Sequence, residues 1–573
     1  MSGPHKPAVR EGPCSPIGLF GGAGLVAAIV ILVLLRLHAF DLPMETDECN
    51  YAVIAARLLA GDRLYVDVWD HQPFGVFTLF AAVITVFGDA PHVFRWMALL
   101  FSVASLLLVF AILRRVAGRG AALLGALLFA LASSDPGTGG EGCNREIYMN
   151  TLILAAWYFS LRHASLPLSS GFRPLPIILS GLCLALASTL KTIAVVHWVL
   201  LAIWIAWGTW FGMNTDRRIK AVATQLSLFA LAPLLVWFAA FGYFAATDRL
   251  SEFADAVFLF NVGYSGSGEP FWMRFIRFFG PMRHPFIFDS ALPLWIGAGI
   301  SSIWMIYECV VHRDLNILAI GLLLLAGYVA ICLPGRFWPH YYHLLLPASV
   351  LAVSITVQGC ATWLRHDLHL GAYGAPMGRV FIYTLVPFTL AVTVGRDYLF
   401  QPPFGITIKR YNSRDFWGQA QGRNVASVTD PDDTIFVFGN DASIYYYSHR
   451  RCASRYTMIT GLAGGMEGSE KRRRILMAEL IANPPRLILV LFDEKPFDEW
   501  LRFLDHSYGE VVGVDYHDRT GDPIMFVFAR KDQPIRTIDW NWDRSAVGGW
   551  QLGERRSSTL IRRPADDRWS ERP

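Results

Sequence analysis

The chain has 573 residues, of which 54% are hydrophobic and only 17% are charged, and its mean hydropathy is +0.38. A water-soluble protein of this size could not hide that much apolar surface, because a large share of any globule's area stays exposed. The net charge of +4 is small, and no basic stripe with interleaved aromatic residues is present, which gives no support for nucleic-acid binding. The composition indicates an integral membrane protein.

A membrane-spanning helix needs roughly 20 apolar residues, and the chain offers about eleven candidates. They are the segments 17–38, 92–113, 120–134, 148–161, 175–190, 193–211, 221–245, 290–311, 315–333, 342–361 and 379–395. The first lacks a small-residue cleavage site, so we expect a retained helix rather than a signal peptide. The run from Phe74 to Phe87, between Pro73 and Gly88, is too short to span and predicts a helix at the membrane interface.

The connections between these segments are alternately basic and acidic, which orients the chain. With the N-terminus inside, the cytoplasmic connections hold the following basic residues: Arg114, Arg115, Arg119, Arg162, Arg173, Arg217, Arg218, Lys220, Arg313, Arg365 and Arg379. The opposite connections, 39–91, 135–147, 246–289 and 334–341, are longer and richer in acids, glycine and aromatic residues. We therefore expect those loops and the C-terminal part to face the periplasm or exterior. Residue usage rich in alanine, leucine and arginine favours a bacterial inner (plasma) membrane.

Beyond Arg396 charges become frequent, and short β-type runs begin at Thr434, Leu487 and Ile524. A helical pattern lies near Glu470–Ile481. We predict three units: a transmembrane catalytic domain over 1–395, a small extracytoplasmic α/β domain over 396–531, and a polar tail over 532–573 whose composition is typical of disorder.

Three polar segments lie in the predicted outside loops. In Glu45-Thr-Asp47-Glu48-Cys-Asn-Tyr51, adjacent acids cannot point the same way on a helix, whereas Asp47 and Tyr51 share a face. One carboxylate is thus free to reach a cavity while the other binds the scaffold. The alternative is an ordinary N-terminal cap, since acids are favoured in a helix's first turn.

The other two segments are Asp70-His71-Gln-Pro73 and Asn144-Arg145-Glu146. An acid and an imidazole ahead of a proline-led helix suit a metal or a phosphate, but, apart from the topology, capping is the favoured explanation of Asp70. The triplet at 144–146 begins a span, where charges are either solvated or, beside a membrane cavity, functional.

Together these segments resemble the GT-C superfamily of membrane glycosyltransferases, in the branch of protein O-mannosyltransferases and lipid A aminoarabinose transferases. The resemblance covers roughly residues 17–395. The matching positions, in chain order, are Asp47-Glu48-x-x-Tyr51, Gly61-Asp-Arg-Leu-Tyr65, Asp70-His-Gln-Pro73, Phe87-Gly88 with Arg95, Asn144-x-Glu146, Lys191 after Gly181, and Arg336-Phe-Trp-Pro-His-Tyr-Tyr342 before Leu346-Pro347.

The resemblance implies a GT-C fold and transfer of a sugar from a polyprenyl-phosphate donor to a hydroxyl acceptor, with inversion. It implies that Asp47 is the general base and that Glu146 is a second catalytic acid, where many relatives have Asp. Some relatives have lysine where this chain has His71, so the roles of Asp70 and His71 stay open between donor-phosphate contact, substrate contact and metal binding.

Cations are expected near the leaving phosphate, because its charge grows in the transition state. The candidates are Lys191 and Arg336, although a lysine at a helix end often simply snorkels. We count as further donor-phosphate or substrate-binding candidates Glu48, Tyr51, Tyr65, Asp70, His71, Arg145, His340 and Tyr341. A divalent metal held by Asp70 and His340 is the cofactor that the pattern leaves open.

Two alternatives to single-sugar transfer remain from the sequence. One is transfer of a whole glycan, and the other is a transporter or flippase of lipid-linked sugars, although no internal repeat is visible. The expected partners are a polyprenyl-phosphate-linked sugar, a glycan, lipid or protein acceptor, and membrane lipid. The sugar and the acceptor are not identified. If both outside loops line one cavity, Cys49 and Cys143 are positioned for a disulfide.

Overall fold

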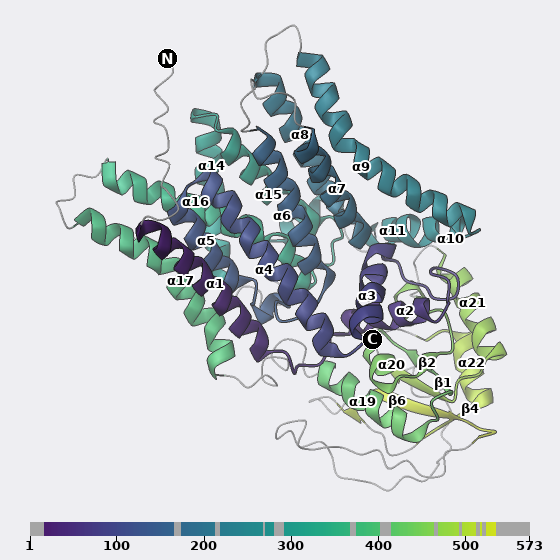
Figure 1. The fold of residues 1–573 in the computed structure, drawn as a ribbon. Coiled ribbons are helices and arrows are strands. Elements are labelled where there is room, and N and C mark those ends of the chain that lie inside the picture. Colours follow the sequence, from purple (N-terminus) through teal and green to yellow (C-terminus); the bar gives the residue numbers. More distant parts are fainter. Residues whose placement is uncertain are drawn as a thin grey trace.

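The computed structural model describes residues 16–164, 174–212, 218–266, 270–279, 291–366, 374–400, 414–462, 468–491, 496–511, 516–517 and 523–533. They form a large helical bundle with a small mixed sheet at one end (Figure 1). The predicted fold class, a mostly helical polytopic membrane protein with a small C-terminal α/β part, is confirmed. Nearly all of the predicted polar tail lies outside the described residues.

Each predicted span coincides with a described helix. These helices are α1 (Pro16–His38), α4 (Pro91–Val116), α5 (Arg119–Ala132), α6 (Arg145–Ala164), α7 (Leu175–Leu190), α8 (Val195–Gly212), α9 (Arg218–Ala246), α14 (Leu292–Val311), α15 (Leu315–Cys332), α16 (Leu346–His366) and α17 (Gly374–Phe400). Within the described residues, 6 helices are long and apolar enough to cross a membrane. They are the helices α4, α8 with the turn before it, α9, α14, α15 and α16. The total of about eleven therefore stays a prediction.

The first outside loop contains two helices, α2 (Thr46–Leu59) and α3 (Phe74–Phe87). Helix α3 has the predicted bounds, because Pro73 supplies the extended residue before it and Gly88 ends it at a φ of 84°. Its first turn packs tightly on α7: a Cβ at Gly75 would lie 2.5 Å from the carbonyl oxygen of Thr189. Only glycine permits this approach, which fixes α3 beside the end of α7. The interfacial position of α3 stays a prediction.

Short elements complete the same end of the bundle. They are the 3-10 turns Pro136–Thr138, Thr192–Ala194 and Pro339–Leu344, the helices α10 (Leu250–Ala254), α11 (Phe260–Gly266) and α12 (Phe271–Arg277), and a π-helical turn over Asp255–Leu259. A π-helical turn is uncommon and often lies at a functional site. Here Asn261, just after it, donates a 2.8 Å hydrogen bond to the carbonyl of His71.

The C-terminal sheet has the strand order β2-β1-β3-β6-β4, with β5 also pairing β6. The strands are β1 (Thr434–Phe438), β2 (Arg451–Cys452), β3 (Leu487–Leu491), β4 (Tyr508–Glu510), β5 (Tyr516–His517) and β6 (Pro523–Arg530). Strand β1 pairs in parallel with β2 and β3, and β6 runs antiparallel to β3. Every residue of β3 is buried, as its unbroken apolar sequence indicates. The helices of this part are α19 (Arg414–Val428), α20 (Ser443–Ser448), α21 (Ser469–Ala482) and α22 (Asp498–Ser507).

The segment that follows β2 is attached to the first outside loop by hydrogen bonds to its backbone carbonyl groups. The Arg57 guanidinium donates to the carbonyl of Ser454 at 3.0 Å, and the Trp69 amide donates to the carbonyl of Arg455 at 2.9 Å. Figure 1 shows α2, α3 and the sheet together at one end of the bundle. Residues some 400 positions apart in sequence are thereby held against each other.

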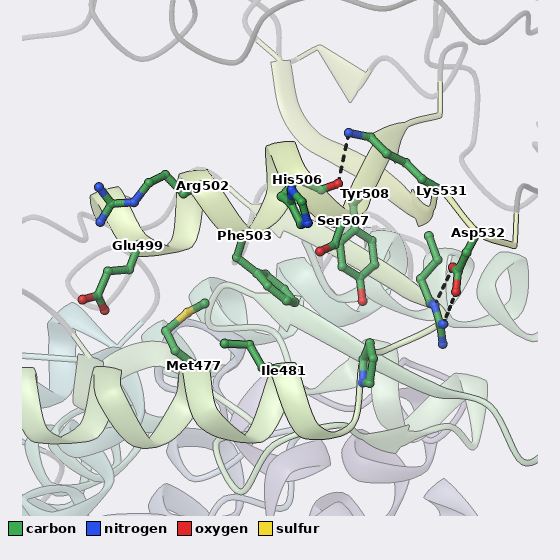
Figure 2. A pocket seen from close by; sticks show the side chains of 12 residues that line it. Met477, Ile481, Glu499, Arg502, Phe503, His506, Ser507, Tyr508, Lys531 and Asp532 are labelled. Atoms are coloured by element: carbon green, nitrogen blue, oxygen red, sulfur yellow. Dashed lines mark hydrogen bonds and ion pairs between the residues drawn. The ribbon is translucent and has the colours of Figure 1, made fainter.

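A surface groove of about 790 Å³ lies in the C-terminal part, between α21, α22, β4 and β6 (Figure 2). Met477 and Ile481 of α21 face Phe503 of α22 and Tyr508 of β4 across its apolar floor. None of the predicted site residues lines this groove.

Candidate active site

Helix α2 begins with two acids that have different surroundings. The Glu48 carboxylate accepts a 3.1 Å hydrogen bond from the Glu45 amide, so it caps the helix. It also accepts from the Cys143 amide and lies 3.5 Å from the Arg95 guanidinium. Glu48 therefore ties the two outside loops together, and the predicted division between one scaffold carboxylate and one free carboxylate describes this helix.

Asp47 is the least buried of the carboxylates in this group. Its side chain is 31% exposed, against 9% for Glu45 and for Asp70 and 0% for Glu146. The ring of His340 lies between two of these acids, with Nε2 3.9 Å from Asp47 Oδ2 and Nδ1 4.0 Å from Glu45 Oε1. Among these four acids, Asp47 is the most accessible to a ligand.

Glu146 lies at the start of α6 in a fully buried ion pair. Its Oε1 accepts a 2.7 Å hydrogen bond from Lys191 Nζ and lies 3.6 Å from Arg145 Nε. The same ammonium sits 3.3 Å from the centre of the Tyr341 ring. Lys191 is thus held between a carboxylate and an aromatic face, both of which favour its charged form.

Asp70 and His71 form a second polar group beside the first. Asp70 accepts 2.7 Å hydrogen bonds from the Asn50 side-chain amide and from the Gln72 backbone amide. His71 Nδ1 lies 3.6 Å from Asp70 Oδ1, and its ring contacts that of Tyr264 at 5.3 Å between centroids. Asp70 closes a turn ahead of α3, whereas the helix itself begins after Pro73 without a side-chain cap. The capping role that the sequence allowed for Asp70 is therefore not observed, and its carboxylate lies near Asp47.

The guanidinium groups of Arg336 and Arg145 lie against aromatic rings. The Arg336 guanidinium lies 4.0 Å from the Tyr264 ring centre and donates to the carbonyl of that residue. Arg145 lies 5.5 Å from the centre of the Tyr51 ring. The buried Tyr51 hydroxyl makes no hydrogen bond to any residue that the structure describes.

Burial and neighbouring charges shift the titration of this group. Desolvation raises the pKa of Asp47 to about 6, although Arg145 opposes it. Desolvation likewise raises the pKa of Asp70 to about 6, and it lowers the pKa of His71 to about 3. Burial lowers the pKa of Lys191 to about 8, against the pull of Glu146. Shifts of this size in opposite directions are typical of functional sites.

The structure brings most of the predicted residues into one cluster. Asp47, Asp70, Glu146, Arg145 and Lys191 interact electrostatically, and the other predicted residues in contact with them are Tyr51, His71, His340 and Tyr341. Tyr65 differs: its hydroxyl donates to the carbonyl of Gln72, so it braces the loop that carries Asp70.

Three residues of the cluster were not predicted as site residues: Glu45, Asn50 and Tyr264. Both Glu45 and Asn50 lie within the acidic segment that the sequence singled out. Helical spacing from Asp47 could have indicated Asn50, whereas Glu45 precedes the helix and has no such signal. Tyr264 lies in the outside loop 246–289, where nothing in the sequence distinguishes it from other aromatic residues.

The described residues contain no group of three or more His, Cys, Asp or Glu side chains placed to hold a metal ion. Both oxygens of Asp70 already accept N–H groups, and the His340 ring lies against Glu45 and Asp47. The predicted metal pair of Asp70 and His340 therefore has no support in the described geometry.

The predicted disulfide is wrong. Cys49 and Cys143 are both buried, and no disulfide joins them in the structure. The Cys49 thiol points back at the carbonyl of Met44, at 3.6 Å, within its own helix start. The two loops are joined instead by Glu48, which accepts the Cys143 amide.

No family model and no curated protein matches the sequence. Solved structures do. The AglB oligosaccharyltransferase of Archaeoglobus fulgidus, in complex with an inhibitory peptide and a dolichol-phosphate, superposes with a TM-score of 0.55 at 14% identity, over 90% of this chain and 75% of the other. ArnT from Cupriavidus metallidurans, bound to undecaprenyl phosphate, gives 0.55 at 16% identity, over 88% and 98%. Both are GT-C membrane glycosyltransferases, so this chain has the GT-C fold, and the resemblance seen in the sequence is confirmed at the level of the fold.

Proposed function

We propose that this protein is a membrane glycosyltransferase that moves a sugar from a polyprenyl-phosphate donor to a hydroxyl acceptor, with inversion and with Asp47 as the general base. The fold supports it, because AglB and ArnT were solved with dolichol-phosphate and undecaprenyl phosphate, respectively. The observation that carries it is the Asp47 carboxylate, 31% exposed in a cluster whose other carboxylates are buried.

The reaction is a single displacement at the anomeric carbon. Asp47 takes the proton of the acceptor hydroxyl as the acceptor oxygen bonds to that carbon. The bond from the carbon to the donor's phosphate oxygen breaks, and its electron pair leaves with the phosphate. Attack opposite the leaving group inverts the configuration. A pKa of about 6 leaves Asp47 ionised at neutral pH while keeping it basic enough to accept a proton.

The leaving phosphate gains charge, and the cluster supplies cations for it. Arg336 is the half-buried one, held flat against Tyr264. Its planar fork suits bidentate contact with phosphate oxygens. Lys191 and Arg145 lie deeper and add positive potential at the same place.

Glu146 then acts as a counter-ion rather than as a second base. It is fully buried and already bonded to Lys191, so an acceptor hydroxyl has no access to it. Its charge keeps Lys191 protonated and Arg145 in place. This role differs from the catalytic one that the resemblance implies for this position.

The proposal places the reaction outside the cytoplasm of a bacterial cell, because the basic connections alternate with the loops that hold the cluster. A hydroxyl of a glycan, a lipid or a protein would serve as acceptor.

Transfer of a whole glycan is the second candidate, favoured by the similarity to the AglB oligosaccharyltransferase. The two candidates differ in the donor that is turned over. Single-sugar transfer uses a monosaccharide on a polyprenyl phosphate, whereas whole-glycan transfer needs an oligosaccharide on a lipid carrier.

The test is turnover by purified protein in liposomes. Each arm receives one lipid-linked donor, either a monosaccharide or an oligosaccharide, with a panel of hydroxyl acceptors, and released lipid phosphate is measured. We expect release from the monosaccharide donor by wild type and by Asp41→Asn, an exposed acid ahead of α2, and none by Asp47→Asn. Release from the oligosaccharide donor alone would select the second candidate. Equal rates for wild type and Asp47→Asn would overturn the catalytic assignment.

A further inference from the structure

Asn50 links the segment that follows β2 to the candidate active site. Asn50, on α2, is 1% exposed and uses both ends of its side-chain amide. Its Nδ2 donates to Asp70 Oδ2 at 2.7 Å, and its Oδ1 accepts from the Thr457 hydroxyl at 2.6 Å. Thr457 belongs to the segment that follows β2 and is itself buried.

The loop that carries Thr457 is firmly attached to the first outside loop. The Arg455 carbonyl accepts from the Trp69 amide at 2.9 Å, and the rings of Tyr456 and Trp69 pack at 5.5 Å between centroids. The Ser454 carbonyl accepts from Arg57. The position of Thr457 is therefore fixed by the contacts of its neighbouring residues as well as by its own side chain.

The hydroxyl of Thr457 decides how the Asn50 amide is oriented. A buried amide oxygen without a donor is costly, so loss of the hydroxyl would force the amide to turn in search of another partner. Turning moves Nδ2 away from Asp70. Asp70 would keep the hydrogen bond from the Gln72 amide to Oδ1. It would lose the hydrogen bond from Asn50 that orients Oδ2. Arg145 and Asp47 are the charged neighbours that sense such a movement.

We propose that Thr457 is a positioning residue of the active site, through which the C-terminal sheet sets the geometry of Asp70 by way of Asn50. The expected effect of Thr457 on catalysis rests on the proposed function. The inference gives the C-terminal part an indirect, positioning role in the reaction, although that part contributes no group to the charged cluster itself.

The test compares Thr457→Val with Thr460→Val. Both changes replace a hydroxyl by a methyl group, but the Thr460 hydroxyl donates to the Asn440 side chain at 2.8 Å, within the C-terminal part. We expect Thr457→Val to lower kcat by about tenfold with an unchanged KM for the donor, the effect of losing one hydrogen bond. Thr460→Val should retain the wild-type kcat, and Thr457→Ser, which keeps the hydroxyl, should restore it.

A cycle with Asp70→Asn separates positioning from general loss of structure. If Thr457 acts through Asp70, Thr457→Val causes no further loss of kcat in the Asp70→Asn background. Full additivity, or an equal loss in Thr460→Val, would overturn the proposal.

Hydrogen exchange over residues 46–73 distinguishes failure of this inference from failure of the proposed function. If no donor is turned over by wild type, the proposed function fails, yet faster exchange in Thr457→Val than in Thr460→Val still supports the positioning contact. Equal exchange in the two variants overturns it.

Discussion

Replacing Glu146 with Gln removes the negative charge from a buried ion pair of the cluster. Glu146 Oε1 and Lys191 Nζ are 2.7 Å apart, which corresponds to roughly 6 kcal/mol of gross attraction at an effective dielectric constant of about 20. Desolvation offsets much of this attraction. Removing one partner, however, leaves the other charge buried, so we expect Glu146→Gln to destabilise the protein by about 3–5 kcal/mol near neutral pH.

The loss should depend on pH with a definite sign. The folded-state pKa of Lys191 is lowered to about 8, whereas in the unfolded chain lysine stays protonated to about 10.4. Above pH 8 the folded protein therefore holds a mostly neutral Lys191, and the charge pair is largely gone in wild type as well. The cost of Glu146→Gln should be smaller at about pH 9 than at about pH 7, and it should not vanish, because Arg145 keeps its charge.

Denaturant titration in mixed micelles at both pH values measures these differences. Glu470→Gln, at an exposed position of α21, is the matched control and should stay within about 0.5 kcal/mol of wild type. Adding Lys191→Met to Glu146→Gln should recover part of the loss, because no uncompensated ammonium remains. A Glu146→Gln protein as stable as the control, or costs that simply add in the double variant, would refute the reasoning.

Two further predictions follow from the same geometry. The pH profile of kcat/KM for sugar transfer should be bell-shaped. It should rise through about pH 6 as Asp47 ionises and fall above about pH 8 as Lys191 loses its proton. A flat profile would contradict both assignments. Gly75→Ala should lower the unfolding temperature, because its Cβ would lie 2.5 Å from the Thr189 carbonyl oxygen. Gly208→Ala, which has open space around it, should leave the unfolding temperature unchanged. Equal thermal shifts in the two variants would show that α3 does not need this close approach.

Much of the fold was predictable because its signals are local. Each apolar run that was predicted as a span coincides with a helix in the structure. Pro73 and Gly88 delimit α3 at the predicted residues. The unbroken apolar run Leu487–Leu491 is a strand, as predicted, and every residue of it is buried. The π-helical turn Asp255–Leu259 was not predicted, because its sequence carries no local signal that distinguishes it from an α-helix.

The candidate site was predictable in its members but not in their roles. Charge alternation across the membrane placed the acids of both loops on one side, and the structure brings Asp47, Asp70 and Glu146 together. The separate roles depend on partners distant in sequence: Glu146 is neutralised by Lys191, and Asp70 is held through Asn50 by Thr457. No spacing within one loop reveals such contacts.

The most direct test of the central claim is the rate of the chemical step in Asp47→Asn. Asparagine keeps the shape of the side chain but cannot accept the acceptor's proton. Single-turnover transfer from a bound polyprenyl-phosphate sugar should fall by about 10²–10⁴-fold, while the dissociation constant of the donor stays at the wild-type value. A variant that binds the donor normally and transfers the sugar at the wild-type rate would contradict the assignment of Asp47 as the base.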